Sequence, residues 1–249
     1  MLILLPPSET KRPGGSGAPF DAASLALPAL APHRDAVVDA LVALSADAHT
    51  AARVLKLGRT QLGEVEVNAA LRAAPTMPAI DRYTGVLFDA LDAASLDAAA
   101  RRWLGGHVLI HSAPFGPVSA LDPIPAYRLG ASTSLPGVPP LRRHWAADAS
   151  AALADLAPRF VLDLRSEAYV ALGPVPATLT SRYVRVVSEG ADGAVRALNH
   201  FNKHAKGALV RRLAEERPRI DGAAAFLAWA DAAGLRAREG AAGELELFA

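Results

Sequence analysis

The 249-residue sequence has no cysteine, and only 6% of its residues are aromatic. Without thiols there are no disulfides, no thiolate nucleophile and no cysteine-ligated zinc or iron–sulfur centre. No apolar run approaches the roughly 20 residues that a membrane-spanning helix needs. The opening five apolar residues stop at Pro6 and Pro7 and follow no basic segment, unlike a secretory signal. We therefore expect a cytoplasmic protein without a membrane partner.

The net charge is also small: 26 basic and 25 acidic side chains give +1. A dedicated nucleic-acid binder is usually more basic, although a local patch can sit in a neutral total. Only four of the basic residues are lysines, and the many arginines accompany an alanine excess that is typical of GC-rich coding. Arginine content is therefore weak evidence for phosphate binding. With 51% apolar residues the chain can bury a large core.

Apolar periodicity predicts a mixture of strands and helices without a regular βαβ repeat. We expect helices at 33–57 with a break and an N-cap at Ser45, and at 62–73, 89–102 with Ser95 as N-cap, 146–156, 165–172, 203–216 and 221–233. Strands are expected at 1–5, 107–113, 160–164, 235–239 and 244–248, and a long proline-rich loop at 114–140. Segments 183–188 and 194–199 flank an Asp-Gly turn and predict a hairpin. The fold class is α/β (mixed α+β): a single domain over 1–249 with a mixed sheet surrounded by helices.

The stretch Asn199–Gly207 (NHFNKHAKG) is the most unusual part of the chain, because two lysines stand at the expected start of a helix that has no acid until Glu215. The positive end of the helix dipole disfavours cations there. Such a helix start favours an anionic ligand, which the backbone N–H groups and the lysines would bind together. The alternative is an ordinary basic helix on the protein surface.

Four further polar clusters follow strands or begin loops. They are Ser8, Glu9 and Lys11; Asp81, Arg82, Tyr83 and Thr84; Asp122, Tyr127 and Arg128; and Asp163, Arg165, Ser166, Glu167 and Tyr169. Ligands of open α/β sheets collect at the carboxyl ends of strands, so these clusters could converge with the lysine-bearing helix. Each could equally be structural, with Ser8 and Glu9 capping a turn and Asp163 a buried, satisfied acid.

If these clusters converge, they form one anion-recognising pocket, which would hold a nucleotide, a nucleobase or another anionic small molecule. The candidates for a catalytic role are Glu9, Asp163, Tyr169 and Lys203. The candidates for ligand binding are Ser8, Lys11, Tyr83, Thr84, Tyr127, Arg128, Ser166, Glu167, Asn202, Lys203 and Lys206.

Familiar catalytic and metal motifs are missing. The Gly14–Gly17 loop lacks the Lys-Ser/Thr ending of a phosphate-binding loop, and no GxSxG turn supports a hydrolase triad. His200 and His204 have metal-ligand spacing, but no HExxH pattern or third ligand is near. Direct iron binding would need Asp122 and Asp163 with His200. We expect no metal site and no cofactor.

A DNA-binding reading rests on other residues. Leu57–Gly63 lies between two expected helices, contains Gly58 and Arg59, and directly follows Lys56. Such a segment is expected of a helix-hairpin-helix turn, although Glu64 and Glu66 follow it. Arg211 and Arg212 add basic charge to the C-terminal helix. An ordinary helix–helix turn is the alternative.

Six segments together resemble one known family. LLPPSETK, IDRYTGVLFDAL, FGPVSALDPIPAYRLG, HW at 144–145, FVLDLRSEAY and HFNKHAKG occur in this order over most of the chain and resemble the YaaA family of peroxide stress proteins. The resemblance implies a mixed α/β fold and a cytosolic bacterial role in limiting damage from hydrogen peroxide. It also implies lowered intracellular free iron and binding to double-stranded or branched DNA through a helix-hairpin-helix element.

The family's signature falls on a defined set of positions here: Tyr83, Thr84, Gly85, Gly116, Leu121, Pro123, Tyr127, Arg128, Trp145, Ser166, Glu167, Tyr169, Lys203, Ala205 and Gly207. Three departures change charge or polarity. Better-known members read SPAKT where this chain has PPSET, so Glu9 replaces a lysine. Phe115 and Ser119 replace a Tyr and an Arg, and KKARG becomes the segment from Lys203 to Gly207. Two readings therefore stay open: a DNA-binding stress protein, or an enzyme or ligand binder with one pocket.

Overall fold

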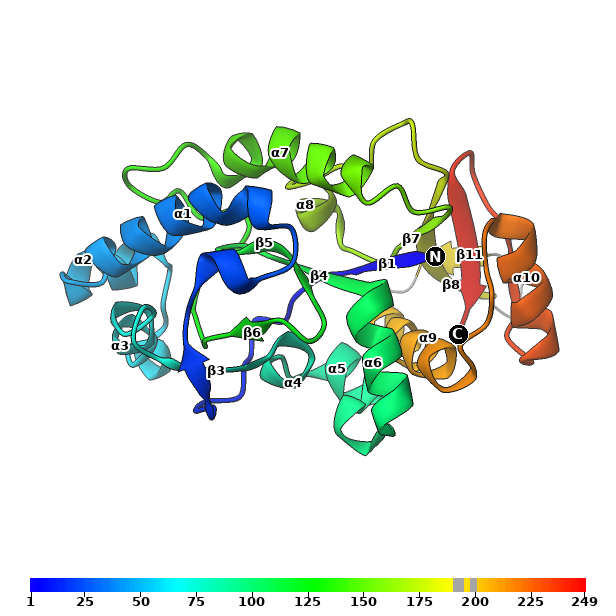
Figure 1. Cartoon of the computed structure of the whole chain (residues 1–249), viewed down its shortest axis with the longest axis horizontal. Coiled ribbons are helices and arrows are strands. Elements are labelled where there is room, and N and C mark those ends of the chain that lie inside the picture. The colour runs from blue at the N-terminus through cyan, green and yellow to red at the C-terminus, as the bar shows by residue number, and fades with distance from the viewer. Residues whose placement is uncertain (190–194, 198–200) are drawn as a thin grey trace.

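The central feature of the computed structural model, which describes the chain except residues 190–194 and 198–200, is a twisted mixed sheet (Figure 1). Over the described residues it has eight strands in the order β10-β11-β8-β7-β1-β4-β5, with β9 pairing β8. The bounds are β1 Leu2–Leu5, β4 Val108–Ser112, β5 Gly116–Ser119, β7 Val161–Asp163, β8 Ser181–Glu189, β9 Val195–Ala197, β10 Ala237–Glu239 and β11 Glu244–Phe248.

The five inner strands β4, β1, β7, β8 and β11 run parallel, and β5 and β10 are antiparallel neighbours at the two edges. Leu4 pairs with Leu109 on one side and with Asp163 on the other. All four residues of β1 are buried, as expected for an apolar strand covered on both faces. The parallel register brings the carboxyl ends of β1 and β7 to the same edge of the sheet.

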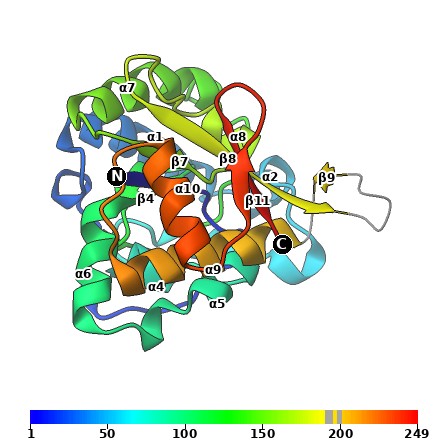
Figure 2. The ribbon, with the colours of Figure 1, turned by 90° about the vertical axis from the view of Figure 1, so that its right-hand side faces the viewer.

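Helices cover both faces of this sheet (Figures 1 and 2). On one side lie α1 and α7, and on the other α5, α6 and α9. The bounds are α1 Ala31–Leu44, α2 Ala48–Val54, α3 Glu64–Ala69, α4 Ala79–Arg82, α5 Val86–Leu91, α6 Ala98–His107, α7 Leu141–Asp155, α8 Glu167–Val170, α9 Phe201–Glu216 and α10 Ala223–Ala232. One continuous cluster of buried apolar side chains extends from Ile3 to Leu247.

Helices α5 and α9 approach each other at a glycine. A Cβ atom on Gly207 would lie 2.1 Å from the carbonyl oxygen of Leu87, so only glycine allows the two backbones this spacing. Contacts of real Cβ atoms are essentially never that short, so the first half of α9 packs against α5 more closely than any other residue at this position would allow. The cationic start of α9 is therefore fixed relative to α5.

Several sequence predictions are confirmed, and others are corrected. The opening strand, the strand at 107–113, the β8–β9 hairpin pairing and both terminal strands are present, although the turn of the hairpin lies outside the described residues. Ser45 and Ser95 are not N-caps. Asp47 caps α2 by accepting from the backbone N–H groups of His49 and Thr50, and Asp97 caps α6 by accepting from that of Ala100.

The segment 114–140 is not simply a loop, because it contains β5 and part of a second sheet. This small sheet has the order β2-β3-β6, with bounds β2 Gly17–Pro19, β3 Pro75–Pro78 and β6 Pro123–Ile124. Prolines at strand ends hid these short strands from a propensity argument. The helix predicted at 62–73 is also shorter, and α7 begins five residues earlier than predicted.

In the described part of the chain, no helix combines the length and apolar character that crossing a bilayer requires.

Candidate functional site

A cavity of about 800 Å³ lies where β1 and β7 end, between α8 on one side and the start of α9 on the other. We call it the α9 cavity. Its walls combine apolar side chains from α5 and β8 with a polar set from four parts of the chain. The polar lining residues are Ser8, Glu9, Thr10, Ser166, Glu167, Tyr169, Tyr183, Arg185, Asn202, Lys203 and Lys206.

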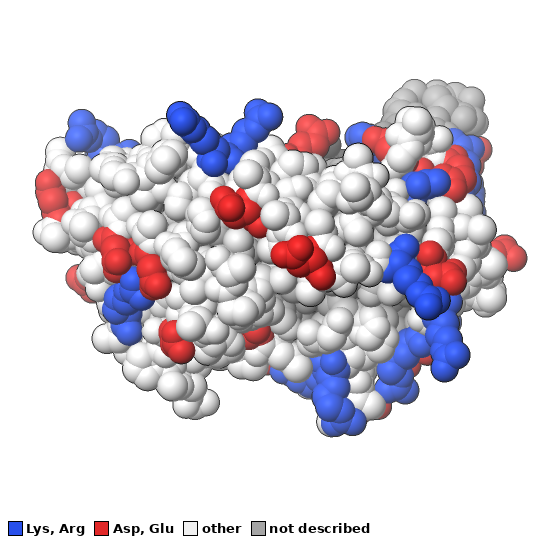
Figure 3. All heavy atoms as spheres, turned by 45° about the horizontal axis from the view of Figure 1, so that its top comes forward, with Lys and Arg blue, Asp and Glu red and all other residues white. Residues whose placement is uncertain are grey.

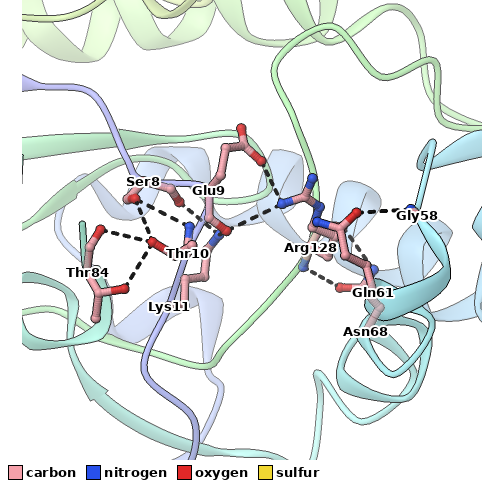
Figure 4. Close-up of polar contacts among 9 residues, drawn as sticks. All are labelled: Ser8, Glu9, Thr10, Lys11, Gly58, Gln61, Asn68, Thr84 and Arg128. Atoms are coloured by element: carbon pink, nitrogen blue, oxygen red, sulfur yellow. Dashed lines mark hydrogen bonds and ion pairs between the residues drawn. The ribbon is translucent and has the colours of Figure 1, made fainter. Parts of the chain in front are cut away.

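The segment after β1 forms one wall and is held by its own side chains (Figure 4). The Thr10 hydroxyl donates to the Thr84 carbonyl at 3.2 Å and lies 3.2 Å from the Ser8 hydroxyl. The Lys11 ammonium donates backward to the carbonyls of Ser8 and Glu9 at 3.0 and 3.3 Å. Lys11 therefore shapes this wall without lining the cavity itself.

Arg128 fixes the Glu9 side chain at the cavity edge. Its guanidinium lies 2.9 Å from the Glu9 carboxylate, and Asn68 holds the Arg128 backbone through two hydrogen bonds of 2.7 and 2.9 Å (Figure 4). Glu9 is 61% exposed and Arg128 only 18% exposed. The predicted clamp residue Arg128 is thus engaged with the predicted acid Glu9.

Two buried tyrosines lie behind the wall. The hydroxyls of Tyr83 and Tyr127 are 2.9 Å apart, and the Lys11 ammonium lies 4.1 Å from the centre of the Tyr127 ring. Burial raises the pKa of Tyr83 to about 12 and lowers the pKa of Lys11 to about 8, with Arg128 and Arg82 further lowering the latter. These groups support the site from beneath, as do Thr84 and its hydrogen bond to Thr10.

The segment after β7 is held by a buried arginine. Arg165 donates to both carboxylate oxygens of Asp163 at 2.9 and 2.7 Å and to the Gly173 carbonyl at 2.8 Å, and it lies 3.0 Å from His111 Nδ1. Desolvation and Arg165 lower the pKa of His111, so this ring is neutral. The network sets the position of the turn that carries Ser166, Glu167 and Tyr169 into the cavity.

Asp163 itself does not line the α9 cavity. It lines a neighbouring cavity of about 560 Å³ that shares Glu167, Tyr183 and Arg185 with the first. Both carboxylate oxygens of Asp163 accept hydrogen bonds from Arg165. Asp163 therefore presents no free carboxylate to the larger cavity, which the predicted catalytic role would require.

The start of α9 supplies the cationic wall. Lys203 is exposed at the rim, whereas Lys206 is only 4% exposed and has its ammonium 5.4 Å from the centre of the Tyr183 ring. Burial lowers the pKa of Lys206 to about 8, with Asp163 opposing and Arg185 adding to the shift. The side-chain oxygen of Asn202 is buried and has no hydrogen-bond partner within the described residues. Asn199 and His200 lie outside those residues.

The residues predicted to bind DNA lie elsewhere. Lys56, Gly58 and Arg59 are exposed between α2 and α3, where the Gly58 N–H donates to the Gln61 side chain at 3.0 Å (Figure 4). Arg211 and Arg212, farther along α9, pair with acids. On the face shown in Figure 3, basic and acidic side chains are interspersed with broad uncharged areas.

Tyr183, Arg185 and Thr10 line the cavity but were missed as site residues by sequence reasoning. The alternation of residues in β8 could have identified the first two. Tyr183 and Arg185 alternate with the fully buried Val184 and Val186, so they lie on the opposite face of the strand from those core residues. Arg185 is held by Glu244 at 2.6 Å, so its charge is partly neutralised.

A metal centre finds no support in the described residues, which contain no group of three or more His, Asp or Glu side chains that could hold an ion. Asp122, considered as an iron ligand, instead accepts hydrogen bonds from the backbone N–H groups of Ala26 and Ser119, both at 2.8 Å.

Comparison with known proteins gives consistent matches over most of the chain. A family model described as "Peroxide stress protein YaaA" matches residues 1–239. A UPF0246 protein of Corynebacterium efficiens is 47% identical over 218 residues, which cover 86% of this chain and 85% of the relative. UPF0246 proteins of Corynebacterium glutamicum and Streptomyces coelicolor are each 44% identical, over 243 residues (96% and 95% of the two chains) and over 215 residues (86% and 82%).

Proposed function

The chain belongs to the YaaA family of peroxide stress proteins, and from this premise we propose that it acts in the cytoplasmic response to peroxide by binding an anionic small molecule in the α9 cavity. A nucleotide is the ligand class that suits the cavity best. The observation that carries the proposal is the convergence of the segments after β1 and β7 with the start of α9 on one cavity.

The cavity offers complementary partners for the parts of a nucleotide. Lys203 and Lys206 supply cations at the positive end of a 16-residue helix, where phosphate groups are favoured. Tyr169 and Tyr183 supply aromatic surface for a base, and the hydroxyls of Ser8 and Ser166 supply hydrogen bonds to a sugar. A volume of about 800 Å³ lies within the range of roughly 300–1,000 Å³ that is usual for small-molecule sites.

A catalytic role would have to use the groups that face this cavity. Among the predicted candidates, Glu9, Tyr169 and Lys203 line it, and Asp163 does not. A limiting effect on iron-dependent damage would then follow from the ligand or its turnover.

A thermal-shift screen with nucleotides, inorganic phosphate and dicarboxylates tests this proposal, because a ligand that binds only the native state raises its melting temperature. We expect a saturable shift with at least one phosphate-bearing compound and the loss of that shift in Lys203→Gln. The control variant Lys56→Gln should retain it. The absence of any saturable shift, or equal shifts in both variants, would contradict the proposal.

DNA binding is a second proposal, favoured by the exposure of Lys56 and Arg59 beside the Gly58 turn and by the family resemblance. Binding of duplex or branched DNA there would release counterions from the DNA, and added salt makes that release less favourable. The affinity should therefore fall steeply between about 50 and 200 mM salt. A mobility-shift titration of wild type and Lys56→Gln/Arg59→Gln tests it. Equal affinity of both proteins for DNA would reject this turn as the contact.

A further inference from the structure

Lys206 is a buried amine held in place at the wall of the α9 cavity. It is 4% exposed, yet it lines the cavity, so its side chain extends inward rather than into bulk solvent. The next residue, Gly207, is the point of closest approach between α9 and α5, which fixes the helix backbone at this position. The ammonium lies 5.4 Å from the centre of the Tyr183 ring.

The surroundings of Lys206 favour its neutral amine form more strongly than bulk water favours that form of an exposed lysine. Leu87, Phe88 and Leu164 line the same cavity, and burial among such groups lowers the Lys206 pKa to about 8. About one amine in ten is then neutral at pH 7, against fewer than one in a thousand for a lysine of ordinary pKa. A desolvated lysine with a lowered pKa is the usual form of a lysine nucleophile.

We propose that Lys206 forms a reversible imine with the carbonyl group of a ligand in the α9 cavity, and that this ligand is an aldehyde or ketone bearing a phosphate or carboxylate. The inference rests on the anion-binding part of the proposed function, and it replaces the nucleotide as the ligand class with a carbonyl compound that carries the anionic group. Lys203 lies three residues earlier on the same helix face, roughly 4.5 Å along the axis, and it is exposed at the rim. It would hold the anionic group while Lys206 meets the carbonyl carbon.

The step needs no oxidant or reductant. The lone pair of the neutral Nζ forms a bond to the carbonyl carbon, the C–O π electrons move to oxygen, and a proton passes from nitrogen to that oxygen. The resulting carbinolamine loses its hydroxyl together with a second nitrogen proton as water, which leaves a C=N bond. When protonated, this imine keeps a cation near the Tyr183 ring and Asp163. Addition of water reverses each step.

The small number of lysines makes the test direct, since the chain has only Lys11, Lys56, Lys203 and Lys206. Pyridoxal 5′-phosphate, which carries both an aldehyde and a phosphate, serves as the probe. The protein is incubated with it, reduced with borohydride, and analysed by intact mass and peptide mapping. We expect one adduct, on Lys206, at least about tenfold above the labelling of the exposed Lys56, and its loss in Lys206→Arg and Lys206→Met.

Pyridoxal without the phosphate separates the two lysine roles. Lys203→Gln should reduce Lys206 labelling by pyridoxal 5′-phosphate severalfold and leave the slower labelling by pyridoxal unchanged. Labelling spread evenly over Lys56, Lys203 and the N-terminus, or an adduct that persists in both Lys206 variants, would overturn the inference.

Binding measured in the same samples separates this inference from the proposed function. If the melting temperature rises with pyridoxal 5′-phosphate in wild type and in Lys206→Arg, and no wild-type adduct forms, the imine is refuted and the anion-binding cavity is upheld. If neither a shift nor an adduct appears with this probe, the imine is refuted and the wider ligand screen decides the cavity. Circular dichroism of both variants confirms that they are folded.

Discussion

The two halves of α9 carry the same number of Lys and Arg side chains but place them in opposite surroundings. In the first half, Lys203 and Lys206 face the α9 cavity. In the second half, Arg211 lies 3.0 Å from Glu215 and 3.4 Å from Asp92 and donates to the Ser95 hydroxyl at 2.9 Å, and Arg212 pairs with Glu216.

The difference shows that the surroundings of a cation, more than the local count, indicate its role. Both arginines are matched by acids one turn later in the same helix. A lysine in the first turn of a helix, such as Lys203, is disfavoured by the dipole and gains most from an anionic partner. The first half therefore fits a binding surface, and the second half fits stabilisation of the fold.

Neutralising the first half should have the largest effect. Hydrogen bonds to charged groups contribute roughly 1.5–3 kcal/mol each, so Lys203→Gln/Lys206→Met should weaken binding of the best phosphate-bearing ligand by about 100-fold or more. The matched variant Arg211→Gln/Arg212→Gln should change affinity less than about twofold. Calorimetric titration of both proteins checks this. Similar losses in both variants would remove the distinction between the two halves.

Breaking the contact that fixes the first half should lower stability. In Gly207→Ala the added methyl would meet the Leu87 carbonyl at 2.1 Å, and such overpacking typically costs about 1–3 kcal/mol. For a chain of this size, we expect a melting temperature lower by roughly 2–10 °C. In Gly222→Ala, where no atom lies within 4 Å of the new methyl, the change should be under about 2 °C. Differential scanning calorimetry decides, and equal changes would speak against a tight α5–α9 contact.

Titration of Lys206 should make the first half sensitive to pH. The groups around it are Asp163 on β7, Tyr183 and Arg185 on β8, Glu167 on α8, and Lys203 on its own helix. Because burial lowers its folded-state pKa to about 8, from the 10.5 of an ordinary lysine, the unfolded chain binds more protons between these values. The free energy of unfolding contributed by this group therefore rises with pH across that window.

Chemical denaturation of wild type and Lys206→Met at pH 7 and pH 10 measures this effect. Lys11 has a similar pKa but is present in both proteins, so its contribution cancels in the difference. Wild type should gain stability relative to Lys206→Met on going to pH 10, whereas its affinity for an anion should fall. A constant difference between the two proteins would mean that Lys206 titrates like an exposed lysine.

Removing the acid opposite the cationic wall should have the smallest effect. Glu9 is mostly exposed and pairs with Arg128, and such surface pairs contribute about 0–1 kcal/mol to stability. Glu9→Gln should leave the melting temperature nearly unchanged and strengthen anion binding about two- to fivefold, because the substitution removes a negative charge that repels the anion from the cavity edge. Titration calorimetry checks the sign, and weaker binding would show that the Glu9 carboxylate accepts a hydrogen bond from a donor group of the ligand.

Local sequence pattern was enough to predict the strands and the polar ends that build the site. The apolar run Leu2–Leu5 stops at two prolines and the apolar run 160–162 stops at Asp163, which placed Ser8 and Ser166 just beyond strand ends. The fold's parallel register then brings these ends together, and the start of α9 joins them. This convergence was a prediction from α/β topology that the cavity lining now supports.

Features that depend on competition or on distant partners could not be read from the sequence. Ser45 and Ser95 each lie two residues before an aspartate, and the carboxylates of Asp47 and Asp97 took the cap instead, while the Ser45 hydroxyl donates to the Leu41 carbonyl. Lys11 was expected to face the ligand, but the buried Tyr127 ring and two carbonyls hold it behind the wall. Such outcomes follow from tertiary packing rather than local propensity.

Hydrogen exchange of the protein with and without the best phosphate-bearing ligand tests the central claim most directly. Binding in the α9 cavity should slow amide exchange in peptides that contain Ser8–Lys11, Ser166–Tyr169 and Asn202–Gly207, and leave Lys56–Gly63 and α10 unchanged. Slowed exchange confined to Lys56–Gly63, or no change at the three cavity segments, would contradict the account.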